Sequence, residues 1–81
     1  MKVCVQFYSQ LRDLAGAPEL IVDLAEGATV TELLGKVYEK VPALCSRDKS
    51  ILVGAGVEFV DRNYKVQPGD EISIMPPVQG G

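Results

Sequence analysis

The 81-residue chain contains no histidine and no tryptophan, and it has only two cysteines, Cys4 and Cys45. Histidine is the commonest general base near neutral pH and the commonest protein ligand of zinc, so its absence argues against most hydrolases and metalloenzymes. The two cysteines lie far apart and belong to no Cys-x-x-Cys pair, which predicts two reduced thiols. We therefore expect no bound metal and almost no catalytic equipment in the chain itself.

Long apolar runs and clustered positive charge are also lacking. No stretch approaches the roughly 18–20 apolar residues of a membrane span, and the start, MKVCVQFYSQ, has too short an apolar run for a signal peptide. The formal net charge is −3 and the eight basic residues are scattered, a composition that repels phosphate backbones. We expect a cytoplasmic protein that binds neither nucleic acid nor a membrane, and whose partners include a basic protein.

The apolar residues that are present alternate with the period of β-strands. Residues 2–8 and 19–24 each carry an apolar side chain at every second position, so that these side chains lie on one face of an extended chain. This pattern predicts two paired strands. Residues 51–53 and 57–60, on either side of a break at 54–56, predict two shorter strands. Pro68-Gly69 fits the centre of a type II turn. Residues 71–75 then form the last strand, with Ile72 and Ile74 facing inward and Met75 on the opposite face.

Two helices are predicted between these strands. Ser9 is in position to cap a short helix, which Gly16 ends. The segment 29–32 has the spacing of a capping box, and apolar residues then recur at three- and four-residue intervals until Pro42 ends the main helix. Tyr38 falls on the core side of that helix.

This order of elements predicts an α+β fold in which a mixed sheet packs on one main helix. The final strand follows a crossover and is expected to lie parallel to the first strand at the centre of the sheet, as in a ubiquitin-like β-grasp. We divide the chain into a β-grasp domain, residues 1–75, and an extended C-terminal Gly-Gly tail, residues 76–81.

The tail, PPVQGG, begins with Pro76, Pro77 and Val78, which join Met75 in an apolar run that a frayed terminus would not need. Two prolines hold φ at about −65° and stiffen the chain, and six extended residues span up to about 20 Å. Glycines lack a Cβ and pass through a narrow channel. Such a tail delivers the α-carboxylate of Gly81, which can be activated as a mixed anhydride with AMP and attacked by sulfur or nitrogen.

Other polar groups are weaker candidates for chemistry. The pair Asp70-Glu71 reads as a solvated acidic turn, and Ser9 has no histidine or nucleophile elbow to activate it. Tyr8, on the outer face of the first strand, is either a cross-strand partner or part of a binding surface.

The ending PGDEISIMPPVQGG, residues 68–81, closely resembles the end of sulfur-carrier proteins of the MoaD/ThiS family, in its molybdopterin synthase branch. Residues 5–16 resemble the family's first strand, short helix and closing glycine, and residues 29–34 resemble the start of its main helix. The resemblance covers essentially the whole chain. It is interrupted around Gly54, where many relatives carry asparagine.

The resemblance implies a role in molybdenum cofactor biosynthesis. A ubiquitin-activating-like adenylyltransferase would use ATP to adenylate Gly81, and a sulfur donor such as a cysteine desulfurase or rhodanese would convert it to a thiocarboxylate. The sulfur would pass to a pterin precursor in the synthase large subunit, with which the chain would form a heterotetramer. The chain would be no enzyme on its own and would hold no permanent cofactor, because the catalytic side chains belong to the large subunit.

The resemblance also assigns individual residues. Gly81 is the reacting residue. The tail that threads into the partner comprises Pro76, Pro77, Val78, Gln79 and Gly80. The docking surface comprises Phe7, Tyr8, Arg12, Ile74 and Met75.

Two alternatives remain open. The same terminus serves sulfur carriers for thiamin thiazole, cysteine or thiolated tRNA, and the Gly-Gly end on a β-grasp is also that of a ubiquitin-like protein modifier.

Overall fold

The computed structural model describes residues 1–77, and the predictions that concern residues 78–81 lie outside the described part. The elements follow in the order β1 (Lys2–Phe7), α1 (Gln10–Ala15), β2 (Glu19–Asp23), α2 (Val30–Lys40), η1 (Pro42–Ser50, a 3-10 helix), β3 (Leu52–Ala55), β4 (Glu58–Val60) and β5 (Glu71–Met75). Within residues 1–77, no helix has the length and hydropathy needed to cross a bilayer.

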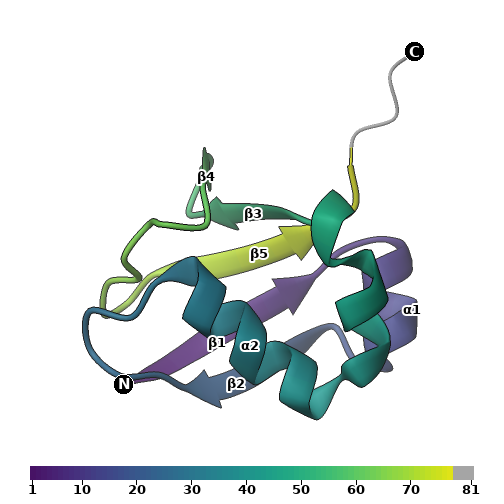
Figure 1. The fold of residues 1–81 in the computed structure, drawn as a ribbon, viewed down its shortest axis with the longest axis horizontal. Helices are drawn as coiled ribbons and strands as arrows, with labels where there is room; N and C mark the ends of the chain where they lie inside the picture. Colours follow the sequence, from purple (N-terminus) through teal and green to yellow (C-terminus); the bar gives the residue numbers. More distant parts are fainter. Residues whose placement is uncertain (78–81) are drawn as a thin grey trace.

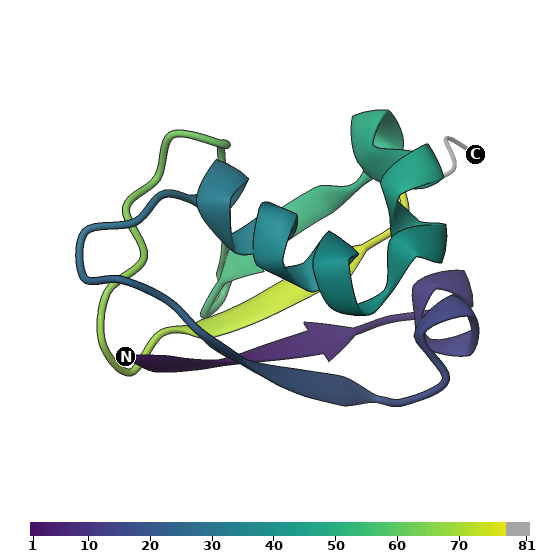
Figure 2. The same ribbon diagram turned by 60° about the horizontal axis from the view of Figure 1, so that its bottom comes forward.

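The strands form one mixed sheet in the order β2-β1-β5-β3-β4. The last strand, β5, lies parallel to β1, with Phe7 opposite Ile74, whereas the other neighbouring strands are antiparallel. Helix α2 crosses one face of the sheet (Figure 1), and η1 lies on the same side (Figure 2). The predicted β-grasp, with the first and last strands parallel at its centre, is confirmed.

The core lies between α2 and the inward face of the sheet. Every second residue of β1 is buried, as the alternation predicted, whereas in β5 Ser73 is buried together with Ile72 and Ile74. Helix α2 contributes four buried side chains. Of these residues, the apolar ones are Val3, Val5, Phe7, Ile72 and Ile74 from the strands, and Val30, Leu33, Leu34 and Val37 from the helix. Each fully buried side chain of this size stabilises the fold by about 1.5–3 kcal/mol relative to an exposed one.

Helix α2 begins as predicted. The side chain of Thr29 accepts a hydrogen bond from the backbone N–H of Glu32, which satisfies one of the free amides of the first turn. The helix ends before Pro42, but the chain then continues as η1, because Leu44 is buried and holds the polar segment that follows against the core. The pattern of residues 45–50 gave no sign of this helix.

Two local predictions were wrong. Ser9 lies at the start of α1, but its side chain forms no capping hydrogen bond, because the residue adopts φ 53° and ψ −132°. Gly54 and Ala55 do not break the strand: both belong to β3, where Gly54 pairs with Phe59 of β4. The hairpin turns at Gly56, whose φ of 64° favours glycine.

Gly35, in the middle of α2, offers a test of how helix propensity acts on this fold. A Cβ built on Gly35 would have no atom within 4 Å, so packing does not require glycine there. We expect Gly35→Ala to raise the free energy of unfolding by about 0.5–1 kcal/mol in urea titrations, because glycine costs about that much in a helix interior. Gly56→Ala is the control and should lower the value by about 1–2 kcal/mol, because its positive φ strains any Cβ. A loss of stability in Gly35→Ala would contradict the prediction.

Candidate functional site

The C-terminal tail starts from the middle of the sheet. Strand β5 lies between β1 and β3 and ends at Met75. The backbone N–H of Tyr8 donates to the carbonyl of Ile74 at 3.1 Å, which fixes the end of β5 against the end of β1. Pro76 is half-buried and Pro77 is exposed, and the chain leaves the domain at this end (Figure 1). The rigid sheet thus sets the point from which the tail begins.

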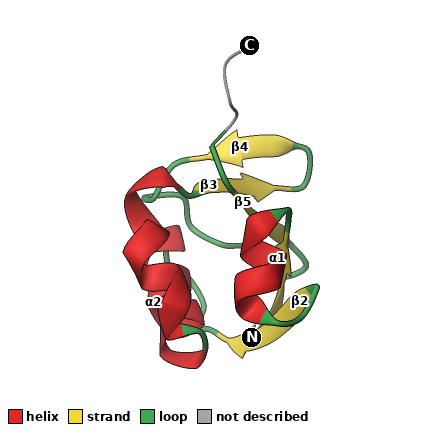
Figure 3. Cartoon of the chain, turned by 90° about the vertical axis from the view of Figure 1, so that its right-hand side faces the viewer, coloured by secondary structure: helices red, strands yellow, loops and turns green. Residues whose placement is uncertain are grey.

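A polar pocket of about 370 Å³ lies beside the first two tail residues. We call it the tail-root pocket. Its walls come from the start of α1 on one side, from η1 on the other and from the tail itself. Figure 3 looks onto this end of the domain, with α1 in the foreground. The lining residues are Ser9, Gln10, Leu11, Arg47, Ser50, Ile51, Pro76 and Pro77.

An exposed apolar patch lies on the sheet face that α2 leaves uncovered. We call it the outer-face patch and define it by Gly54, Val57, Phe59 and Met75, which surround a shallow hollow of about 70 Å³. Phe59 is 65% exposed and Val57 is fully exposed. A Cβ at Gly54 would lie 3.7 Å from the terminal methyl of Met75, so this side chain lies over the glycine. Contiguous apolar surface of this kind marks interaction sites.

The structure separates the five predicted docking residues into two groups. Tyr8, 39% exposed, Met75, half-buried, and Arg12, exposed on α1, lie at the surface. Phe7 and Ile74 are 1% and 0% exposed. Their assignment to the docking surface was wrong, because alternate residues of a strand point to opposite faces, and both of these face α2.

Arg12 does not line the tail-root pocket, where the structure brings in Arg47 and Ser9 instead. Sequence reasoning also missed Phe59. The alternation of residues 57–60 could have identified Phe59. Val60 pairs with the buried Val53 on the core side, and the side chain of the preceding residue, Phe59, must therefore point to the outer face. Arg47 carried no such signal, because its position depends on how η1 packs.

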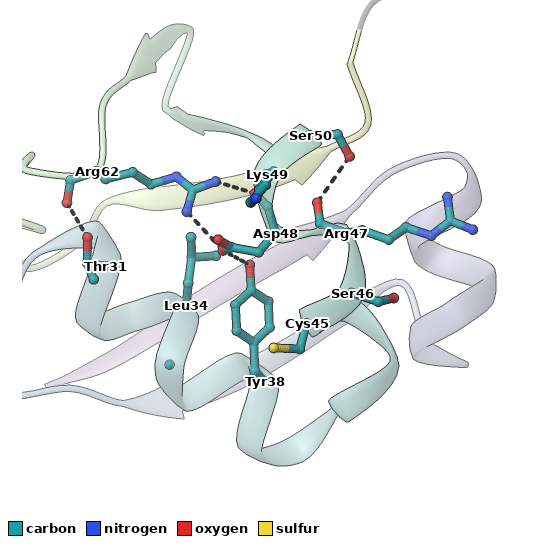
Figure 4. A pocket seen from close by; sticks show the side chains of 11 residues that line it. Thr31, Leu34, Tyr38, Cys45, Ser46, Arg47, Asp48, Lys49, Ser50 and Arg62 are labelled. Carbon is teal, nitrogen blue, oxygen red and sulfur yellow. Dashed lines mark hydrogen bonds and ion pairs between the residues drawn. The ribbon is translucent and has the colours of Figure 1, made fainter.

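A larger hollow of about 660 Å³ lies between α2, η1 and the segment after β4 (Figure 4). The Tyr38 hydroxyl donates to Asp48 at 2.6 Å, and Arg62 donates to the same carboxylate at 2.9 Å and to the Asp48 carbonyl at 2.7 Å. Burial and this hydrogen bond raise the pKa of Tyr38, whereas the bond from Tyr38 lowers the pKa of Asp48. Because the three groups satisfy one another, the cluster explains how η1 is held to α2.

Neither cysteine is placed to react at the tail root. Cys4 pairs with Glu71, at the start of β5, about 13 Å from the end of that strand at the usual rise per residue. Its thiol donates to Glu19 at 3.2 Å, and this hydrogen bond raises the pKa of Cys4. Cys45 is exposed and lines the Tyr38 hollow. Among residues 1–77, no three Cys, Asp or Glu side chains are grouped as metal ligands.

A mixed sheet with its first and last strands parallel at the centre, one main helix across it and a tail leaving the last strand defines a ubiquitin-like β-grasp protein. The model of the ThiS family matches residues 5–81. The chain therefore belongs to the ThiS family.

Full-length relatives and solved structures agree with this family. The chain is 32% identical to the molybdopterin synthase sulfur carrier subunit of Chlamydomonas reinhardtii, with all of both chains covered. It is 27% identical to the subunit of the same name from Arabidopsis thaliana, over all of this chain and 84% of the relative. Among solved structures, SAMP1 of Haloferax volcanii, a small archaeal modifier protein, matches with a TM-score of 0.88 and 29% identity over all of both chains.

Proposed function

We propose that this chain is the sulfur carrier and small subunit of a molybdopterin synthase, and that the carboxylate of Gly81 is the group that carries sulfur. The observation that carries the proposal is the rigid exit of the tail: the central strand β5 ends at Met75 and is followed at once by two prolines and, four residues later, by the terminal glycine. Relatives that match over the full length bear this function in their names.

The proposed chemistry takes place on the backbone. ATP converts the Gly81 carboxylate to an acyl-adenylate, with loss of pyrophosphate, and the outer sulfur of a donor-protein persulfide then displaces AMP to give an acyl disulfide. A thiol cleaves the S–S bond of this intermediate, which leaves the thiocarboxylate on Gly81 and a disulfide on the donor. Transfer of the sulfur to the pterin precursor and addition of water restore the carboxylate. The residues of this chain position the tail and bind partners, so no general base among them is required, which fits the absence of histidine.

Three protein partners follow from this chemistry: an adenylyltransferase, a sulfur donor such as a cysteine desulfurase or rhodanese, and a large subunit that supplies the catalytic side chains in a heterotetramer. The outer-face patch is the surface that we assign to docking on the large subunit. Its Met75 directly precedes the tail, so a protein that encloses the tail also reaches this patch. Large apolar side chains at the centre of an interface contribute most of its binding energy.

Substitution within the outer-face patch tests this docking surface. We expect Phe59→Ser to weaken binding to the large subunit by about tenfold or more in calorimetric titrations, because interface aromatics often contribute 2 kcal/mol or more. Ile21→Ser is a matched control: Ile21 is 52% exposed and lies on the same sheet face, but on the edge strand β2. Equal losses in the two variants would show that the patch has no special role.

A second candidate is a ubiquitin-like protein modifier. The full-length match to SAMP1, a small archaeal modifier protein, favours it. Both functions activate the same terminal carboxylate and differ in the nucleophile that receives it, which is sulfur in the carrier and a lysine amine in the modifier. A sulfur carrier for thiazole, cysteine or tRNA thiolation would share the thiocarboxylate and differ in its partner.

Mass spectrometry of the protein isolated from its native cell, together with the proteins that co-purify, tests the proposal. We expect an intact mass raised by the exchange of one oxygen for sulfur, and co-purification of the synthase large subunit. Isopeptide-linked conjugates on other proteins, without a thiocarboxylate form, would support the modifier instead. A thiocarboxylate with a different partner would assign the chain to another sulfur pathway.

A further inference from the structure

We propose that the tail-root pocket receives an acidic side chain of the large subunit, with Arg47 and Ser9 as its binding groups. The inference rests on the proposed function, because it assumes that a partner encloses the tail. It concerns residues that the sequence did not single out for partner binding, and it is independent of the outer-face patch.

Arg47 is a cation at the pocket whose guanidinium forms a single hydrogen bond within the described part of the chain. Its guanidinium donates from Nη1 to the side-chain oxygen of Gln10 at 3.3 Å, across 37 residues of sequence. It forms no ion pair with any residue in the range 1–77, in contrast to Arg62, which lies 2.9 Å from Asp48. Arg47 also lines the Tyr38 hollow, but Figure 4 shows its guanidinium pointing away from Tyr38. Since a guanidinium carries five N–H donors, several remain for a ligand.

Ser9 adds a hydroxyl from the opposite wall. Its φ of 53° and ψ of −132° lie in a region that glycine adopts most easily, so the backbone of Ser9 is strained. The hydroxyls of Ser46 and Ser50 bond to nearby backbone carbonyls. The Ser9 hydroxyl forms no hydrogen bond with another described residue and borders the pocket. Strained backbone conformations cluster at binding and active sites, which suits a binding role for the Ser9 hydroxyl.

The chemistry of the pocket selects a carboxylate. A guanidinium and a hydroxyl donate together to the two oxygens of an Asp or Glu side chain, and such charge-assisted bonds are about twice as strong as neutral ones. The floor is formed by the buried side chains of Leu11 and Ile51, which suit the methylene groups of an acidic residue.

The position of the pocket identifies the partner. Pro76 and Pro77, the first residues of the tail, form one wall. A protein that encloses the tail must therefore pass over the mouth of the pocket, so the pocket continues the interface that the tail begins. A volume of about 370 Å³ is enough for one inserted side chain.

Calorimetric titration of the intact chain with the large subunit tests this inference. We expect Arg47→Ala to weaken binding by about tenfold or more, because the partner carboxylate would be left buried and unpaired. Lys49→Ala is the matched control: it removes the same charge from the same helix, but Lys49 does not line the tail-root pocket, and binding should change by less than about twofold. Equal losses in the two variants would indicate general electrostatic attraction and overturn the inference.

Ser9 is tested by two substitutions that differ in their effect on stability. Ser9→Ala removes the hydroxyl and keeps the strain, whereas Ser9→Gly removes both and should raise the thermal unfolding midpoint. We expect both variants to weaken binding by about tenfold or more, as loss of a hydrogen bond to a charged group does. Tighter or unchanged binding by the stabilised Ser9→Gly variant would show that the hydroxyl has no role.

A cross-linking experiment identifies the occupant directly. The Arg47→Lys variant, treated with a carbodiimide in the complex, should join residue 47 to an Asp or Glu of the large subunit, and peptide mapping should find that link. Links from Lys49 alone would overturn the assignment. If the wild-type chain itself fails to bind the large subunit, the proposed function and this inference fail together. If wild type binds and every Arg47 variant binds equally well, only the pocket assignment fails.

Discussion

A chain that lacks Gly81 is expected to fold normally and to lose sulfur transfer completely. The described core and all five strands of the sheet are built from residues 1–75. The free energy of unfolding should therefore stay within about 0.5 kcal/mol of wild type, as for other changes outside packed regions. The reactive carboxylate would instead end one residue short of its place in the partner, and a displacement of about 3.5 Å removes the alignment on which the reaction depends.

Intact mass measured after co-expression with the adenylyltransferase and a sulfur donor provides the readout. Wild type should show the oxygen-to-sulfur exchange, and the shortened chain should show none. A chain extended by one alanine after Gly81 is the companion variant, because it keeps every native residue and moves the carboxylate outward. Sulfur incorporation by either variant, without trimming of the added residue, would refute the role of the terminal carboxylate.

The adjacent residues Phe7 and Tyr8 should lose very different amounts of stability on alanine substitution. Phe7 is 1% exposed and packs in the core, so Phe7→Ala should lower the free energy of unfolding by about 3–5 kcal/mol. Folded domains are stable by only about 5–15 kcal/mol, and a chain this short lies towards the lower end, so much of the variant should unfold at 37 °C.

Tyr8→Ala should instead retain most of the stability. The Tyr8 side chain is 39% exposed, and its hydroxyl donates to Gln6 of β1 at 3.0 Å. Its loss should lower the free energy of unfolding by about 1 kcal/mol or less. Urea titration of the two variants measures the difference. A Phe7→Ala chain as stable as Tyr8→Ala would show that the inward face of β1 contributes little to the core.

Several features of the fold were determined by local sequence. The alternation in residues 2–8 and 71–75 identified β1 and β5 and their inward faces, because a strand places side chains on alternate sides. Thr29 and Glu32 defined the start of α2 through a hydrogen bond within one turn. The prediction of a stiff, narrow tail depends only on the two prolines and two glycines of residues 76–81, whose backbone constraints are intrinsic.

Other features depend on which distant segments pack together, and no local pattern encodes that. Arg47 reaches the tail root because η1 docks beside α1, and Gln10, 37 residues earlier, receives its guanidinium. Phe59 joins Met75 because β3 lies between β4 and β5. Serine is a favoured residue at the start of a helix. The turn from β1 into α1 nevertheless gives Ser9 a backbone conformation in which its hydroxyl forms no capping hydrogen bond. The sequence alone thus determined the framework of the fold and the backbone character of the tail, whereas tertiary packing decided which side chains surround the start of the tail.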